Sequence, residues 1–302
     1  MFDYEYWGYN VLHGDVTMAL EEYMLKRSAE TKKAMIRFYS FPKDTIILGY
    51  SQATDVLKHG NINVVRRPTG GSHVQTGPNV LAYSFAAPHN GLGGITDMRR
   101  YYSEHIANAF SKLGIEDVNI DLGASSLNVG DNVVAGQAIA WGRESGLLHG
   151  LLVVKPYDLE KLASRIALGT RVIGGKVYSD YDAIRNMPTM IELLPKLANG
   201  AKDKTEALKE ILCQAILNEV TKGKYKQMQV TYKTVQEAYP LAEKRYAQRF
   251  WTTTHNPVFT PEEIEEIPGE ELNGELKKGL GYCFYIQVDD TKFKRMASPE
   301  EN

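Results

Sequence analysis

The order of predicted helices and strands limits the fold more than any other feature of this sequence. Apolar residues at helical spacing predict a first helix over residues 14–26, and β-rich runs then predict strands at 34–39, 45–50, 62–65 and 80–85. An amphipathic helix follows over 98–113, with Asp97 expected as its N-cap. Because strands and helices do not alternate as regular βαβ units, we expect an α+β fold in which mixed or antiparallel sheets pack with helices.

The C-terminal half of the sequence predicts a long helix over residues 204–220, a strand over 226–235 and a helix over 241–249. In the first helix, Glu21 and Glu22 are expected on the solvent-facing side. The two cysteines, Cys213 on an apolar helix face and Cys283 in a late strand, are expected to be core thiols.

The composition excludes several classes of protein. The chain has 302 residues, with 43% hydrophobic and 24% charged residues, as in soluble globular proteins of one or two domains. A net charge of -2 without a basic cluster gives no indication of nucleic-acid binding, and no apolar run is long enough to span a bilayer. The first residues lack a secretory pattern, so we expect a cytoplasmic protein.

Residues 66–74, which we call the glycine-rich loop, give the strongest local indication of function. Arg66 and Arg67 follow a predicted strand, and Gly70 and Gly71 come shortly after them. Adjacent glycines let backbone N–H groups approach an anion, and arginines add charge and fork-shaped donors. The same pattern also fits a hairpin turn with surface arginines, so the local sequence leaves both interpretations open.

Several segments in a fixed order resemble the lipoate–protein ligase A family, which is related to biotin ligases and octanoyltransferases. They are residues 14–22, 37–42 with 48–52, the glycine-rich loop, 134–138 with 149–150, and a weaker match over 242–251. Together they cover roughly residues 10–255. The resemblance implies a biotin/lipoate ligase (class II synthetase-like) catalytic domain over residues 1–255. Residues 256–302 are then a short C-terminal extension, too short for a full accessory domain.

The resemblance further implies a two-step ligase. Lipoate or octanoate would react with ATP, in the presence of Mg²⁺, to form an acyl-adenylate. The acyl group would then pass to a lysine of an apo lipoyl domain, carried by glycine cleavage H protein or a 2-oxoacid dehydrogenase E2. A separate accessory subunit is a further expected partner. The residues that the resemblance places around substrate and nucleotide are Arg66, Arg67, Thr69, Gly70, Gly71, Ser72, His73, Val74, Val133, Ala135, Gly136, Ala138, His149 and Gly150.

The sequence departs from the family at two positions that matter for catalysis. The family's lysine, which contacts the carboxylate and the adenylate, corresponds here to Val133, and its His-Asp pair corresponds to Thr76 and Gly77. Octanoyltransferases use a cysteine nucleophile, and no cysteine lies near these segments. The catalytic group is therefore unassigned. Candidates for a replacement cation or base are Arg66, Arg143, Lys155, Lys176 and His149, each of which can also be an ordinary surface or structural residue.

Three functions remain open at this point. The first is an ATP-dependent lipoate–protein ligase in which another cation replaces the lysine. The second is a non-catalytic paralogue that binds an acyl group, a nucleotide or a lipoyl domain. The third is an octanoyl or lipoyl transferase without a cysteine nucleophile, in which His73 or His149 would act as the base.

Overall fold

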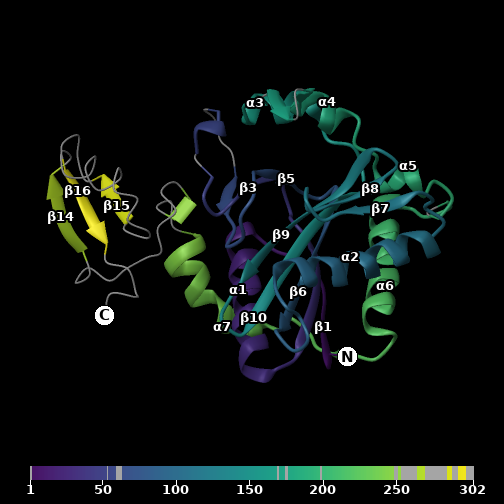
Figure 1. The fold of residues 1–302 in the computed structure, drawn as a ribbon, viewed down its shortest axis with the longest axis horizontal. Coiled ribbons are helices and arrows are strands. Elements are labelled where there is room, and N and C mark those ends of the chain that lie inside the picture. The colour runs from purple at the N-terminus through teal and green to yellow at the C-terminus, as the bar shows by residue number, and fades with distance from the viewer. Residues whose placement is uncertain are drawn as a thin grey trace.

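The computed structural model describes residues 2–52, 54–58, 63–168, 170–173, 176–197, 199–247, 251–252, 264–268, 284–287 and 292–296. Within them, the largest feature is an eight-stranded sheet with the strand order β13-β1-β2-β6-β10-β9-β8-β7 (Figure 1). β1 runs parallel to β13 and β2, and the other neighbouring pairs are antiparallel. The strands are β1 (Tyr4–Val11), β2 (Ala34–Ser40), β6 (Val80–Pro88), β7 (Val118–Asp121), β8 (Ser126–Val129), β9 (Asn132–Trp141), β10 (Ser145–Val153) and β13 (Lys226–Gln227).

Helices cover both faces of this sheet. α2 (Ile95–Lys112) and α6 (Lys204–Thr221) pack on one face. α1 (Gly14–Thr31) packs on the other, together with α7 (Tyr232–Leu241) and the π-helical segment Ala242–Tyr246. β2 and β6 are buried at every position because alternate side chains enter the two cores.

A second, three-stranded sheet lies beside the first and carries the glycine-rich loop. Its order is β4 (Val64–Arg66), β3 (Thr45–Leu48), β5 (Val74–Thr76). β3 is parallel to β4 and antiparallel to β5. Since β4 and β5 flank β3, the loop that joins them must pass across the end of β3.

The remaining elements lie at the periphery. A third described sheet has the order β14-β16-β15 (Figure 1). These peripheral elements are the 3₁₀ turn η1 (Thr54–Val56), α3 (Leu159–Arg165), β11 (Thr170–Ile173), β12 (Lys176–Ser179), α4 (Asp180–Arg185), α5 (Met190–Leu193), β14 (Ile264–Pro268), β15 (Phe284–Gln287) and β16 (Lys292–Met296). Each helix within the described residues is too short or too polar to traverse a lipid bilayer.

The α+β prediction is confirmed, two local predictions are wrong, and one predicted helix is confirmed in part. The strand expected over 226–235 is only Lys226–Gln227, because the Thr231 hydroxyl accepts from the Thr234 N–H and begins α7. Asp97 is not the N-cap of α2, and its carboxylate instead accepts from the Gly93 N–H. The helix expected over 241–249 is π-helical from Ala242 to Tyr246, and residues 248–249 lie outside the described residues.

Candidate functional site

Two glycines let the glycine-rich loop pass close to the end of β3. The Arg67 N–H donates to the Leu48 carbonyl at 3.0 Å, and the Tyr50 N–H donates to the Thr69 carbonyl at 2.8 Å. A Cβ atom on Gly49 would lie 1.7 Å from the Gly71 carbonyl oxygen, and Gly71 itself has a φ of 91°. Both positions therefore require glycine. This favours a loop whose backbone packs closely against the end of β3 over a hairpin turn with surface arginines.

Arg67 holds this loop in shape from the inside. Its Nε donates to the Thr69 hydroxyl at 2.9 Å, and its Nη2 donates to the carbonyls of Gly70 at 2.6 Å and Ser72 at 2.9 Å. Nη1 has one long contact, 3.5 Å to the Ile47 carbonyl, and so keeps donor capacity for a ligand. Burial lowers the pKa of Arg67 to about 10, which leaves the guanidinium charged at neutral pH.

Arg66 points elsewhere. The fully buried guanidinium donates at 2.6–3.1 Å to the main-chain carbonyls of Gly49, Tyr50, Gln52, Trp251 and Thr252. The Trp251 indole N–H returns a hydrogen bond of 2.9 Å to the Arg66 carbonyl. Arg66, which the sequence predicts to contact substrate, instead bonds to main-chain carbonyls and so joins residues 49–52 to residues 251–252.

A buried hydrogen-bonded chain runs from the loop to α1. The Thr69 hydroxyl lies 2.6 Å from His149 Nε2, and His149 Nδ1 lies 2.8 Å from a Glu21 carboxylate oxygen. Glu21 also accepts from the hydroxyls of Tyr39, at 2.6 Å, and Ser84. Both ring nitrogens of His149 are therefore occupied, and the imidazole fixes the position of Thr69 in the loop.

The electrostatics of this chain favour an ionised Glu21. Burial raises the pKa of the Glu21 carboxyl, but the facing His149 ring and the donated hydrogen bonds outweigh burial and hold that pKa below its usual range. Burial, with the neighbouring Glu21 charge, holds the pKa of Tyr39 well above its usual range, so Tyr39 remains a donor. The expectation that Glu21 and Glu22 face solvent is wrong. Glu22 is also buried, and it accepts from Arg245 at 2.7 Å.

A cavity of about 360 Å³ opens beside the glycine-rich loop, between the small sheet and the main sheet. We call it the loop cavity. Its walls are mainly apolar, with one guanidinium and one imidazole, a combination that suits a ligand with an anionic head and an apolar chain. The lining residues are Tyr39, Ile47, Arg67, Gly71, Ser72, Val74, Thr76, Ala82, Ala124, Ser125, Gly136, Gln137, Ala138, His149, Gly150 and Leu151.

Most of the site residues expected from the sequence meet in this cavity. Those that line it are Arg67, Gly71, Ser72, Val74, Gly136, Ala138, His149 and Gly150. Ala135 instead packs in the core under α2 and α6, and Val133 is 39% exposed on β9. Gly70 is exposed, and His73 Nδ1 lies 2.7 Å from Gln52 Nε2.

The structure brings none of the candidate replacement cations into the described lining of the loop cavity. Arg143 is exposed in the β9–β10 turn, beyond the Gly146–Trp141 pair, which is itself three residue pairs along the hairpin from the His149–Ala138 pair. Lys155 is exposed beyond the end of β10. Lys176 begins β12, and its side chain lies outside the described part of the structure. Among the described lining residues, Arg67 is the one permanent cation.

Sequence reasoning missed several residues of the site. Glu21 and Tyr39 belong to it through the hydrogen-bonded chain, and Ile47, Ala82 and Leu151 form its apolar walls. The wall residues lie on different strands, so only the packing of the two sheets brings them together. A signal did exist for Glu21, because it lies three residues after Met18, on the helix face that is buried.

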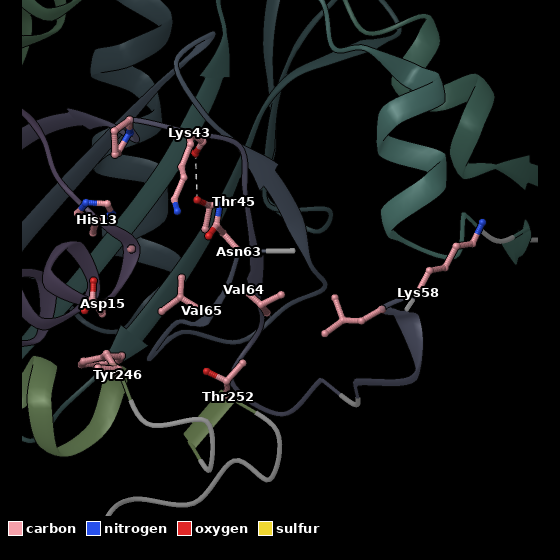
Figure 2. A pocket seen from close by; sticks show the side chains of 14 residues that line it. His13, Asp15, Lys43, Thr45, Lys58, Asn63, Val64, Val65, Tyr246 and Thr252 are labelled. Carbon is pink, nitrogen blue, oxygen red and sulfur yellow. Dashed lines mark hydrogen bonds between the residues drawn. The ribbon is translucent and has the colours of Figure 1, made fainter. Parts of the chain in front are cut away.

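A separate cavity of about 570 Å³ lies beside the N-terminus of α1. Figure 2 shows its polar lining, which includes His13, Asp15, Lys43, Thr45 and Asn63. The Thr45 hydroxyl donates to the Lys43 carbonyl at 3.0 Å and so has its partner within the protein.

The profile of the lipoyl protein ligase A/B catalytic domain matches residues 13–180. This span contains the glycine-rich loop, Glu21 and His149, and therefore every residue of the buried hydrogen-bonded chain. The chain belongs to the lipoyl protein ligase A/B family. The resemblance inferred from the sequence is thereby confirmed.

Known ligases of the family align with most of the chain. Lipoate–protein ligase 1 of Staphylococcus aureus is 24% identical over 265 residues, which are 85% of this chain and 75% of that protein. A lipoate–protein ligase of Streptococcus pyogenes is 25% identical over 284 residues, 90% of this chain and 79% of the relative. This member of the family is lipoate–protein ligase-like over most of its length.

Solved structures share the fold. A Thermoplasma acidophilum protein with bound lipoic acid superposes with a TM-score of 0.64 at 18% identity, covering 84% of this chain and 99% of that one. A lipoate–protein ligase A bound with ATP has the same TM-score at 19% identity, with coverage of 84% and 99%. At these identities the likeness establishes the fold, which is that of the ligase family.

Proposed function

We propose that this protein is a lipoate–protein ligase that acts in the cytoplasm on apo lipoyl domains. Lipoate or octanoate lies in the loop cavity with its carboxylate toward the glycine-rich loop, and ATP supplies the activating group. The observation that carries this proposal is the meeting of an apolar cavity with the Arg67 guanidinium and the glycine-rich loop. Relatives solved with lipoic acid and with ATP support the choice of ligands.

The proposed reaction has two steps. A carboxylate oxygen of the acid attacks the α-phosphorus of ATP, and pyrophosphate leaves. The lysine amine of the lipoyl domain then attacks the acyl carbonyl carbon, loses a proton, and AMP leaves. Arg67 stabilises the negative charge of both reactants, and the loop N–H groups orient them. Mg²⁺ enters with ATP and is held mainly by its phosphates.

The valine at position 133 leads us to expect a low rate of adenylation. An isopropyl group stands where the family resemblance places an ammonium, and the described cavity lining offers no second permanent cation. A lost transition-state donor lowers kcat by about 10²–10³-fold. We therefore expect slow adenylation, while the Arg67-centred binding site remains intact.

The same observation favours a second function, a non-catalytic paralogue that binds the acyl group, the nucleotide or the lipoyl domain. A cysteine-dependent transferase has less support. Cys213 is buried in α6, away from the loop cavity, and burial raises the pKa of its thiol. In a transferase without a thioester, His149 would be the base, and its ring nitrogens bond to the Thr69 hydroxyl and the Glu21 carboxylate.

Incubation with ATP, Mg²⁺, octanoate or lipoate and an apo lipoyl domain tests the proposal by the mass of the domain. The domain of an E2 subunit is the first choice, since a structural relative is a bipartite ligase solved with its E2 lipoyl domain, and H protein is the second. We expect slow ATP-dependent acylation that rises about 10²–10³-fold in Val133→Lys. The ligase hypothesis is refuted if neither the parent protein nor Val133→Lys acylates the lipoyl domain. Acylation that occurs only with an acyl-carrier donor establishes the transferase.

Domain organisation belongs to the same proposal. We assign the catalytic unit to residues 1–255 and treat 256–302 as a C-terminal extension. The bipartite relative motivates a search for a separate accessory subunit, which would be added to the acylation assay as purified protein. If acylation is faster only when the accessory subunit is present, that subunit supplies the function that the family lysine would otherwise provide.

A further inference from the structure

Thr76 is the least exposed of the described residues that line the loop cavity. Along the segment that enters the cavity, Gly71 and Ser72 are exposed, Val74 is half-buried and Thr76 is 1% exposed. Val74 and Thr76 are two residues apart on β5, so their side chains share one face, and both line the cavity. The cavity wall therefore includes both the exposed Ser72 and the buried Thr76, which lie up to about 13 Å apart.

The hydroxyl of Thr76 is buried and has no hydrogen-bond partner. Other buried polar side chains that line the loop cavity have partners, since Tyr39 donates to Glu21 and His149 bonds to Thr69 and Glu21. A buried hydroxyl without a partner is unfavourable and therefore calls for an explanation. Among the described residues that line the loop cavity, Thr76 is the one with a buried side-chain oxygen that has no hydrogen-bond partner within the protein.

Thr76 also lies between the loop cavity and a second cavity. This smaller cavity, of about 140 Å³, is lined by polar residues that include Asp44, Gln75 and Lys161. Thr76 is the one described residue that lines both cavities. A chain that enters beside the exposed Ser72 and fills the loop cavity would therefore meet the Thr76 side chain.

We propose that Thr76 is a specificity-determining residue that selects acyl chains by the polarity of their buried end. Its hydroxyl forms a hydrogen bond with a polar group at the end of the chain. An unsubstituted alkyl chain of the same length leaves that hydroxyl unpaired and binds more weakly, by about tenfold. The sulfurs of a dithiolane accept hydrogen bonds only weakly, so lipoate falls between the two. This inference rests on the proposed function, in which the loop cavity holds the acyl chain.

Direct binding tests the inference without requiring catalysis. Dissociation constants for octanoate and 8-hydroxyoctanoate are measured by calorimetry on the full chain and on Thr76→Val, which keeps the shape but removes the hydroxyl. We expect the parent protein to bind 8-hydroxyoctanoate with a dissociation constant about tenfold lower than that for octanoate. Thr76→Val should lose or reverse this preference. Thr45→Val is the matched control, because Thr45 faces Thr76 on β3 and already has its own hydrogen bond.

The outcomes are distinct. An equal preference ratio in the full chain and in Thr76→Val overturns the inference, including the case in which a bound water satisfies the hydroxyl. A ratio that changes as much in Thr45→Val overturns it as well, because the effect then comes from the sheet. If neither acid binds to the full chain, the proposed function fails and the inference fails with it.

Discussion

Replacing Arg66 with methionine tests whether this residue is structural. Arg66→Met keeps an unbranched side chain of similar length but removes the guanidinium hydrogen bonds from five main-chain carbonyls, of which Gly49 keeps the Gln52 N–H as a donor. A hydrogen bond to a charged group contributes about 1.5–3 kcal/mol, but the five share one guanidinium whose burial is itself unfavourable. We therefore expect a loss of about 3–5 kcal/mol in the free energy of unfolding, the range for disrupting a buried charged network.

Thermal unfolding followed by circular dichroism measures this loss. For a chain of this order of size each kcal/mol shifts Tm by about 2–4 °C, so Arg66→Met should lower Tm by about 6–20 °C. Arg143→Met is the matched control, since Arg143 is exposed, and its Tm should stay within about 2 °C of the parent. A Tm of Arg66→Met as close to the parent as that of the control would refute the structural role.

Two further predictions concern the buried chain and the loop. The lowered pKa of Glu21 means that its contribution to stability is present above about pH 4.3 and is lost as pH falls through that lowered value. Glu21→Gln should lower the free energy of unfolding by about 3 kcal/mol at pH 7. The fall in that free energy between pH 7 and pH 4 should also be smaller in Glu21→Gln than in the parent. Urea titrations at pH 7 and pH 4 measure both, and an unchanged acid decline would contradict this reasoning. Gly49→Ala should weaken octanoate binding by about tenfold or more, because its Cβ meets the Gly71 carbonyl and the loop must shift. Calorimetry that finds parental affinity would show that the loop tolerates the displacement.

The parts of the site that could be predicted are those encoded by neighbouring residues. Paired glycines after a strand and an adjacent arginine identify the loop, and the structure places Gly71 and Arg67 together at the cavity. Arg66 and Arg67 could not be distinguished, because adjacent residues at a strand end point to opposite sides and the sequence does not show which side faces the cavity. Glu21 was placed in solvent because a carboxylate on a helix is usually exposed, and its partner His149 lies 128 positions away.

The errors in the fold have similar causes. β-branched residues around Thr231 favour a strand locally, yet the Thr231 hydroxyl caps a helix that packs on α1. The sequence predicts β2 and β6 of the main sheet, but it does not predict the N-terminal strand β1 or the order of the strands. The order depends on pairings such as β1 with β13, which join residues more than two hundred positions apart.

The hydrogen bonds between Arg66 and Trp251 have a thermodynamic consequence beyond stability. They join the base of the glycine-rich loop to a segment near the end of the assigned catalytic unit. Free-energy coupling between two sites is reciprocal, so a ligand that orders the loop also strengthens the docking of Trp251. Conversely, displacing the Trp251 segment would weaken the ordering of the loop, and with it the binding of a ligand that the loop holds, by the same free energy.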